Sequence, residues 1–340
     1  MLWNLQRLMW KFLPADRAVS FTLRIFGLLL ALALATFIAA HFLKRRRLSR
    51  IAIAIAALTL LTWALLFITR PAWLRIAMQP AVPIPTITAL HWETRAPGLD
   101  TADLELRVGG AIVDHMVLVR LDPHYYRFTV HWDPTATRTA EEWQRELGAV
   151  VVVNGSYFGQ DHVPLTPLRC AGQPAGPASY QSTHGAFVTD GTRVDIIDLQ
   201  NRDALQAIAP YPDAMVSYPL LIDAAGANRS AESKFWLASR NFVALDEAGR
   251  VILGTTETGF FTLHRLGDFL KASPLGLRIA LNLDGGPLVS QVIRAGNFTR
   301  NFHGKAEISD GSDVLRVFWQ SHVSTPWGLP VVLVAQPISP

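Results

Sequence analysis

The sequence predicts an α+β fold, a mixed β-sheet domain with a few helices, preceded by an N-terminal two-helix transmembrane hairpin. Three observations lead to this prediction. Residues 25–43 and 51–69 each form a run of nineteen residues without a formal charge. After residue 87 the chain changes to short β-rich runs bounded by turn residues. Within that later part, two segments have a helical pattern.

The two uncharged runs predict a membrane anchor. Each is long enough to cross a bilayer as a helix. The first run is followed at once by KRRR and then by the second run, with no small-residue cleavage site between them, so we do not expect a cleaved signal peptide. Residues 1–24 are basic and contain Trp3 and Trp10, which is typical of an amphipathic tail at a membrane interface.

The basic residues around the two runs predict the orientation of the anchor. The short loop 44–50 has five basic residues in seven, whereas four are spread over the longer tail. The positive-inside rule therefore favours a cytoplasmic loop. We expect the inner or plasma membrane, with the C-terminal domain periplasmic or extracellular. The reverse orientation, with that domain in the cytoplasm, stays open because the tail is also basic.

A proline-rich linker follows the hairpin. Residues 70–87 contain Pro71, Pro80, Pro83 and Pro85, which block a regular helix and stiffen an extended spacer. This change in composition marks a boundary. We expect residues 88–335 to form a single domain, because no internal repeat and no low-complexity tract divides them.

The charge distribution argues against a nucleic-acid binder. The net charge is +4, but residues 1–75 hold eleven Lys and Arg and one acid, so the remainder has twenty basic and twenty-six acidic residues. The folded part is therefore mildly acidic and lacks a basic stripe with interleaved aromatic residues. Cys170 is the only cysteine, which excludes an intrachain disulfide and a multi-cysteine metal site.

Short runs with alternating or β-branched composition predict the strands of the domain. They are residues 104–108, 113–121, 125–132, 150–153, 185–189, 193–198, 215–222, 242–246, 251–254 and 277–283. Residues 139–147 and 262–272 are predicted helices. Each helix precedes an apolar strand that stops at a polar, glycine-bearing turn. We expect these two helix-strand-turn units to lie side by side in one sheet, with their turns at one end.

The second of these turns, in ALNLDGGP, places Asp284 against Gly285 and Gly286. An Asp-Gly pair after a strand is commonly just a turn, in which Asp bonds its own backbone and Gly takes a positive φ. Glycines beside an acid also let a ligand approach the backbone closely. The pattern of this turn alone favours the first interpretation.

Four motifs together change that balance. They are VVVNGSYF, SYPLLIDAAG, ASRNFVALDEAGRVILGTTETGFFTLHRLGDFL and LRIALNLDGGPLVSQ. In this order and spacing they resemble the phosphodiester glycosidase family over roughly residues 100 to 320, excluding the hairpin. The chain departs from the family pattern at Pro287, Leu288 and Val289, where Gly/Ser-Ser is usual, and at His184, where many members have Asn.

The resemblance implies a set of site residues. Asp284 is expected to act as nucleophile or as base toward water at the anomeric carbon, and Arg240 to bind the departing phosphate through its planar fork of donors. Because a phosphate monoester leaves more easily than an alcohol, one acid and one cation could suffice. Sugar or phosphate binding is expected from the following residues: Asn154, Gly155, Tyr157, His184, Asn241, Asn282, Gly285 and Gly286.

Several of these residues also have a structural interpretation. Glu257 could be a second catalytic acid, although a polar loop between strand and helix explains it as well. His184 before a glycine is typical of a turn, and Arg240 could form a surface ion pair. His162 beside Asp161 falls short of a metal site. The sequence predicts no cofactor and leaves a divalent metal open.

The leading hypothesis is a membrane-anchored exoplasmic hydrolase that cleaves a glycosyl phosphodiester or a related cell-surface glycan linkage. The partners expected are a carbohydrate or sugar-phosphate substrate and the membrane. The altered turn after Gly286 motivates a second hypothesis, a non-catalytic module for glycan binding or envelope polysaccharide assembly. A membrane scaffold acting through the hairpin is a third, and it leaves the large domain without a role.

Overall fold

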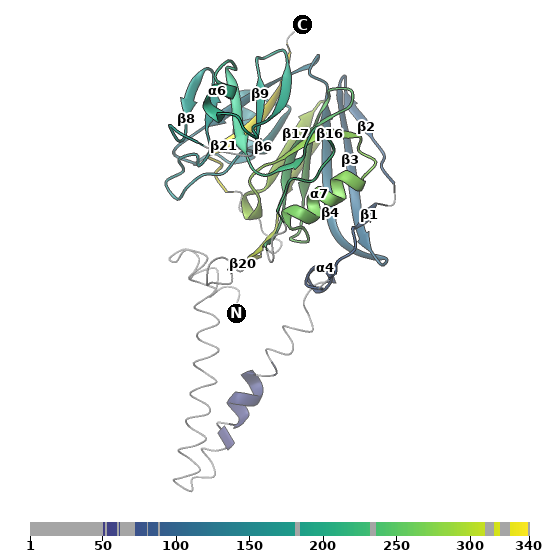
Figure 1. The fold of residues 1–340 in the computed structure, drawn as a ribbon. Helices are drawn as coiled ribbons and strands as arrows, with labels where there is room; N and C mark the ends of the chain where they lie inside the picture. Colours follow the sequence, from purple (N-terminus) through teal and green to yellow (C-terminus); the bar gives the residue numbers. More distant parts are fainter. Residues whose placement is uncertain are drawn as a thin grey trace.

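The computed structural model describes residues 50–51, 53–59, 61, 72–79, 81–87, 89–180, 184–231, 236–309, 316–319 and 327–338 (Figure 1). The tail and the first predicted span lie outside these residues. The described residues between 50 and 61, in the second span, are helical. A helix long and apolar enough to cross a membrane is not found within the part of the chain that the structure describes. The hairpin therefore stays a prediction from the sequence.

The largest sheet of the domain has eight strands, in the order β1-β3-β4-β15-β14-β16-β12, with β2 paired to β3. Its central strands are long and apolar, and β14 and β15 are buried at every residue. The bounds are β1 Thr86–Ile87, β2 Glu93–Ala96, β3 Leu99–Val108, β4 Ala111–Leu121, β12 Leu220–Ile222, β14 Asn241–Asp246, β15 Val251–Thr256 and β16 Leu277–Asn282.

A five-stranded sheet, in the order β18-β17-β6-β21-β5, packs on one face of the large sheet. Valines dominate β6 and β21, as expected for strands that are buried on both faces. The bounds are β5 Tyr126–Trp132, β6 Val151–Asn154, β17 Ser290–Ala295, β18 Phe298–His303 and β21 Val331–Pro337.

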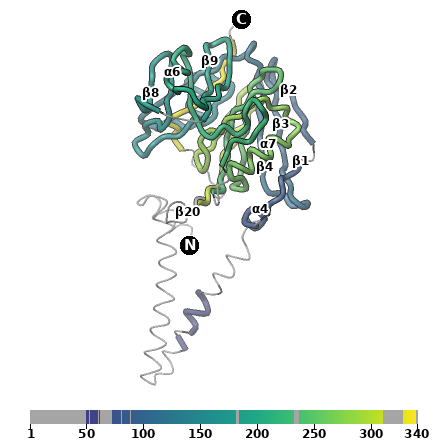
Figure 2. Tube along the Cα trace, viewed as in Figure 1, coloured from purple at the N-terminus to yellow at the C-terminus, as the bar shows by residue number. Residues whose placement is uncertain are grey.

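Two smaller sheets complete the domain. One has the order β10-β9-β11-β7-β8 and the other β13-β19-β20. Figures 1 and 2 show the former, in teal with helix α6, on the side of the molecule away from α7. The bounds are β7 Leu168–Cys170, β8 Gln173–Ala175, β9 Gly185–Thr189, β10 Val194–Asp198, β11 Asp213–Ser217, β13 Trp236–Ala238, β19 Ala306–Ser309 and β20 Arg316–Trp319.

Helices are few, and local sequence signals define their ends. Helix α5 begins after Thr139 and has a reciprocal cap on its first turn. The Thr139 side chain accepts a hydrogen bond from the Glu142 N–H, and the Glu142 carboxylate accepts one from the Thr139 N–H. Helix α7 begins after Thr262 in a similar way. The bounds are α4 Ala72–Ala77, α5 Ala140–Leu147, α6 Ala204–Ile208, α7 Leu263–Ala272 and the 3₁₀ helix η1 Gly286–Leu288. Both predicted helices are confirmed.

The core has two main layers, one on each face of the large sheet. Strand β14 shows the alternation: Val243 and Leu245 pack between the two large sheets, whereas Phe242 and Ala244 face the layer formed with α7 and α4. Successive side chains of a strand point to opposite faces, so a strand between two layers must be apolar throughout. This arrangement holds the ends of β14 and β16 deep in the molecule.

The predicted α+β class, dominated by sheets with few helices, is confirmed, but the sheets are antiparallel rather than mixed. All strand pairs among the described residues are antiparallel, for example β14 with β15 and with β16. Parallel pairs need long crossover connections, usually helices. The short turns of this chain, such as the one between β3 and β4, form hairpins instead.

Two further expectations need correction. The predicted strand 215–222 is two strands, β11 and β12, in different sheets, because Pro219 lacks the N–H that a continuous ladder requires. The two helix-strand-turn units do not share a sheet: β6 lies in the five-stranded sheet and β16 in the large one. Their turns nevertheless meet, since the Asp284 N–H donates to the Gly155 carbonyl at 2.9 Å across the two sheets.

Candidate active site

The turn after β16 is held by backbone contacts that only glycine permits. A Cβ on Gly285 would lie 3.0 Å from the Ser239 carbonyl oxygen and 3.5 Å from Nη1 of Arg240. Gly286 has a φ of +76°, and its N–H donates to the Ser239 carbonyl at 2.8 Å. The two glycines therefore bring the backbone beside Asp284 against the segment that contains Arg240.

Asn154, the last residue of β6, joins the two turns. Its side-chain N–H donates to the main-chain carbonyl of Asp284 at 2.7 Å. Its Oδ1 accepts a hydrogen bond from the Asn241 side chain at 2.9 Å and from the Ser290 N–H at 2.9 Å. Because both polar atoms of the buried amide are used within the protein, Asn154 positions the turn rather than offering its side chain to a substrate.

Asn241 continues this network into the core. Its Oδ1 accepts the Thr255 hydroxyl at 3.1 Å, and the Thr255 oxygen accepts the Gln291 side-chain N–H at 3.0 Å. Asn241, Thr255 and Gln291 are all 0% exposed. Buried polar groups are tolerated when each has a partner, and a satisfied network fixes a unique arrangement. The predicted binding residue Asn241 thus lies behind the turn.

Arg240 is fixed at the start of β14. Its Nε donates to the Phe261 carbonyl at 3.0 Å and its Nη2 to the Trp236 carbonyl at 2.5 Å. Burial lowers the pKa of Arg240 to about 10, while the electrostatic effects of Tyr157, Glu307 and Asp284 act in the opposite direction. The guanidinium is therefore charged at neutral pH, held rigidly, and turned with Nη1 toward Gly285. Arg240 is buried rather than at the surface, and it forms no ion pair with the residues that the structure describes.

The Asp284 carboxyl has an unusual protonation equilibrium. Burial and, to a smaller extent, the charge of Glu307 raise its pKa to about 8, against the lowering effects of the Gly285 N–H and Arg240. Its Oδ1 accepts the Gly285 N–H at 2.9 Å. The side chain keeps part of its surface open to solvent. At neutral pH this carboxyl is mostly protonated and can donate a proton.

Glu307, on β19, is a second carboxylate at this turn. A Cβ on Gly286 would lie 2.7 Å from its Oε2, and its Oε1 accepts the Trp236 indole N–H at 2.9 Å. The sequence analysis missed it because the pairing of β13 with β19 brings it to the turn from a distant segment. Its neighbours in the sequence follow no catalytic motif.

The predicted binding residues Tyr157 and Asn282 form a cluster with Tyr218. The Tyr157 and Tyr218 rings stack with centroids 4.1 Å apart, and the Asn282 side-chain N–H donates to the Tyr157 hydroxyl at 2.6 Å. Burial, together with the charge of Asp284, raises the pKa of Tyr157 well above its usual range. One face of the Tyr157 ring is thus occupied by Tyr218, which leaves less of it for a sugar than expected.

The remaining predicted residues lie around this cluster or away from it. The His184 ring lies 4.8 Å from the Tyr218 ring, and burial lowers its pKa. The Gly155 N–H donates to the Val331 carbonyl at 2.8 Å, and a Cβ there would meet Val331 at 2.6 Å. Glu257 is elsewhere: its carboxylate pairs with Lys305 in a surface hollow that does not include Asp284.

Other reactive side chains of the described residues do not add to this site. Burial raises the pKa of Cys170 to about 12, so its thiol stays protonated at neutral pH. Groups of three or more His, Cys, Asp or Glu side chains that could hold a metal ion are absent from the part of the chain that the structure describes. His162 bonds the Pro134 carbonyl at 3.3 Å.

Comparisons with known proteins give a family match for part of the chain and a match of fold. Residues 147–314 match the family model of the phosphodiester glycosidases. No curated protein matches the chain. The structure of the zebrafish N-acetylglucosamine-1-phosphodiester alpha-N-acetylglucosaminidase catalytic domain, auto-inhibited by its pro-peptide, is 15% identical, covers 79% of this chain and 94% of that one, and has a TM-score of 0.50. That likeness shows the same fold.

A hypothetical protein from Synechocystis is also 15% identical, over 75% of this chain and 64% of that one, with a TM-score of 0.47. The family match spans the strands and turns that hold Asn154, Arg240 and Asp284. The part of the chain that contains these three residues therefore matches the phosphodiester glycosidase family.

Proposed function

We propose that this protein is a hydrolase that cleaves the bond between a sugar and the phosphate of a phosphodiester, on a cell-surface glycan or a related molecule. The observation that supports this most is the meeting of Asp284, Glu307 and Arg240 at one turn. Two carboxyl groups and one rigid cation can supply an acid, a base and a phosphate-binding group for such a reaction.

Arg240 is proposed to bind the phosphate. Its Nε and Nη2 are held by main-chain carbonyls, so the guanidinium does not have to be ordered when the substrate binds. A preorganised cation in a site with little water stabilises the charge that develops on a departing phosphate monoester. The protonated Asp284 can lie beside the phosphodiester anion without repulsion.

The two carboxyl groups are proposed to divide the proton transfers between them. Like charges close together cannot both ionise easily, and here the Glu307 charge raises the pKa of Asp284. Asp284 in its protonated form donates to the oxygen between sugar and phosphorus, while Glu307 accepts a proton from the attacking water. This assignment differs from the expectation from the sequence that Asp284 acts as nucleophile or as base.

Membrane anchoring and an exoplasmic location are part of the proposal. They rest on the sequence, namely the two uncharged runs 25–43 and 51–69 and the basic loop 44–50. A reporter enzyme that works only outside the cytoplasm, fused after Pro340, is expected to be active. Activity restricted to a cytoplasmic reporter would reverse the orientation.

The test of the activity uses the full chain and a panel of sugar-1-phosphate diesters with different sugars, followed by phosphorus NMR. Asp284→Asn and Arg240→Lys are expected to lower kcat at least about a hundredfold. Asp195→Asn and Arg278→Lys are matched controls, because these two residues form a half-exposed pair at 3.0 Å on the surface. They are expected to leave turnover unchanged.

The same experiment separates the second candidate function. A non-catalytic glycan module would bind sugars without turnover by the wild type, and binding would survive both Asp284→Asn and Arg240→Lys. Pro287, in η1 directly after Gly286, supports this second candidate because it departs from the family pattern at the turn. Turnover that the two substitutions leave unchanged would remove Asp284 and Arg240 from the mechanism.

A further inference from the structure

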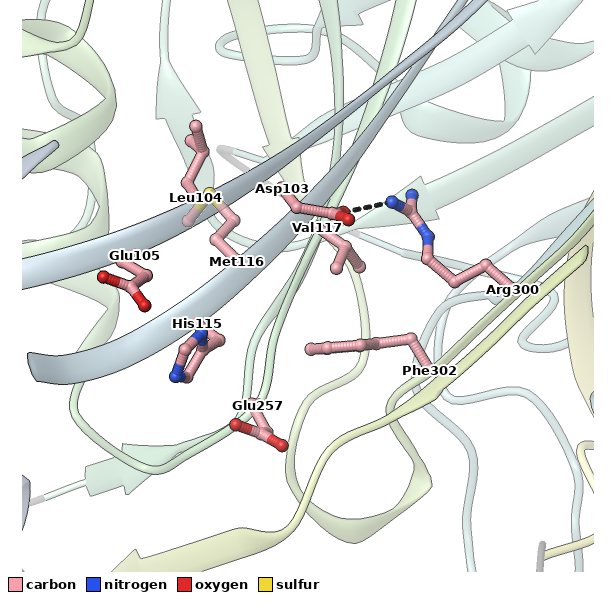
Figure 3. Close-up of a pocket in the computed structure, with 9 residues that line it drawn as sticks. All are labelled: Asp103, Leu104, Glu105, His115, Met116, Val117, Glu257, Arg300 and Phe302. Carbon is pink, nitrogen blue, oxygen red and sulfur yellow. Dashed lines mark hydrogen bonds and ion pairs between the residues drawn. The ribbon is translucent and has the colours of Figure 1, made fainter. Parts of the chain in front are cut away.

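A surface hollow of about 480 Å³ lies beside β3 and β4, away from the Asp284 turn. Its polar lining comes from β3, β4, β18 and the end of β15: Asp103, Glu105, His115, Glu257 and Arg300. Figure 3 shows Phe302 pointing into the space among these side chains. Asp284, Arg240 and Glu307 do not line it.

Each carboxylate of the hollow has a basic partner. Asp103 pairs with Arg300, Glu105 with Arg107 at 2.6 Å, and Glu257 with Lys305. The hollow is therefore close to neutral and has both donors and acceptors along its wall. A phosphate or a single cation would have to compete for charged groups that are already paired. A neutral ligand needs no opposite charge and avoids this competition.

The floor and one wall are apolar. Val117 is buried beneath the hollow, and Phe302 is partly exposed within it. Ligand sites typically combine an apolar surface with a few polar groups that fix orientation. A sugar ring fits this combination, because its C–H face packs on an aromatic ring while its hydroxyls bond to charged side chains at the edge.

The wall of the hollow is joined to the Asp284 turn by short hydrogen bonds. The Ser239 hydroxyl donates to the Glu257 carbonyl at 2.9 Å, and the Ser239 carbonyl accepts the Gly286 N–H at 2.8 Å. Arg300 also donates to Gln291 at 2.8 Å, which begins the buried chain to Asn154. The wall of the hollow and the Asp284 turn are therefore held by the same set of hydrogen-bonded residues.

We propose that this hollow is a second binding site for neutral sugar residues, which holds a more distant part of the glycan whose phosphodiester reacts at Asp284. The lining indicates a neutral ligand with an apolar face and polar edges. The choice of carbohydrate among such ligands rests on the proposed function.

The test is saturation-transfer NMR on the full chain, kept in a detergent whose headgroup is not a sugar. The probes are neutral tetrasaccharides of glucose, mannose, galactose and N-acetylglucosamine. Phe302→Ala is expected to weaken binding about tenfold. Phe302→Tyr, which keeps the ring, is expected to restore it. Tyr125→Ala is the control, since Tyr125 is 51% exposed outside the hollow.

Glu257→Gln is a second variant at the hollow, expected to weaken binding by removing a charged acceptor while keeping the shape. Absence of binding by the wild type to all four probes would overturn the inference, as would binding that Phe302→Ala and Glu257→Gln leave unchanged. Binding through the hollow without any hydrolysis would contradict the proposed function alone. Hydrolysis of small phosphodiesters without this binding would contradict the inference alone.

Discussion

The side-chain amide of Asn154 donates to the main-chain carbonyl of Asp284 at 2.7 Å, although Asn154 ends β6 and Asp284 follows β16, a strand of a different sheet. A second bond, from the Asp284 N–H to the Gly155 carbonyl, runs in the opposite direction at 2.9 Å. The proposed catalytic acid is thus held by the contact between two sheets. Its position depends on how they pack against each other.

Asn154→Ala is expected to destabilise the protein by about 2–4 kcal/mol. The substitution removes the side-chain partner of the Ser290 N–H and of the Asp284 carbonyl, and one of the two acceptors of the Asn241 amide. Urea unfolding measures the change. Asn301→Ala, at an exposed position of β18, is the control and is expected to change stability by less than about 0.5 kcal/mol. Equal effects of the two substitutions would contradict the anchoring role.

Asp284→Asn is expected to stabilise the protein increasingly as the pH rises from about 4 to about 8. The pKa of Asp284 is raised to about 8 in the folded state, so the folded state keeps a proton that the unfolded state has released. The wild type therefore loses stability over this range, and the asparagine variant does not. The difference near pH 8 is on the order of a few kcal/mol.

A matched control exists for this stability effect. Burial also raises the pKa of Asp114 to about 8, and its Oδ1 accepts the N–H groups of His115, Glu257 and Thr258. Asp114→Asn is expected to give a similar dependence of unfolding free energy on pH, without the loss of kcat. A flat difference between pH 4 and 8 for Asp284→Asn would show that its carboxyl titrates normally when folded.

The sequence predicted local structure well because the signals are local. Helix α5 has its capping residues in order, and the apolar run at the start of 242–246 matches β14. The sequence predicted that the turns containing Asn154 and Asp284 lie close together, but it predicted this from a shared sheet, whereas the two turns meet between different sheets. Which strands share a sheet depends on packing over more than a hundred residues, and no local pattern reports it.

Glu307 shows the limit most clearly for the candidate site. It lies outside the motifs that carry the family resemblance, and its place at the turn follows from the pairing of β13 with β19 and the indole bond from Trp236. Glu257 shows the converse. It stands in a motif and is a plausible acid by sequence, but in the fold its carboxylate pairs with Lys305 in another hollow.

Glu307→Gln is expected to move the alkaline limb of the pH–rate profile to lower pH. The Glu307 charge raises the pKa of Asp284, so its removal lets Asp284 release its proton more readily. If the protonated Asp284 is the active form, activity falls as the pH rises through about 8 in the wild type, and earlier in the variant. Profiles of kcat/KM measure this.

The control for this profile is Glu247→Gln, an exposed carboxylate at the turn after β14. It is expected to leave both limbs in place. An unchanged alkaline limb in Glu307→Gln would show that the Glu307 charge does not affect the pKa of Asp284. Activity that rises through pH 8 in the wild type would instead assign Asp284 the role of base.

Gln291→Leu and Asn154→Ala are expected to be coupled in stability, although Asn241 and Thr255 lie between them. The four side chains form one hydrogen-bonded chain: Asn154 to Asn241, Asn241 to Thr255, and Thr255 to Gln291. Once one end is removed, the middle residues can reorient, so removal of the other end costs less. The double variant is expected to be more stable than the sum of single effects implies, by about 0.5–1 kcal/mol.

The matched cycle pairs Gln291→Leu with Asn228→Ala. Asn228 is also hydrogen-bonded, to the His264 carbonyl and to Asp268 at 2.8 Å, but it belongs to the separate layer around α7. These two effects are expected to add within about 0.3 kcal/mol. If the stability effects of Gln291→Leu and Asn154→Ala also add, the hydrogen bonds between these residues contribute independently. In that case the buried hydrogen bonds do not couple the hollow at Arg300 energetically to the turn that holds Asp284.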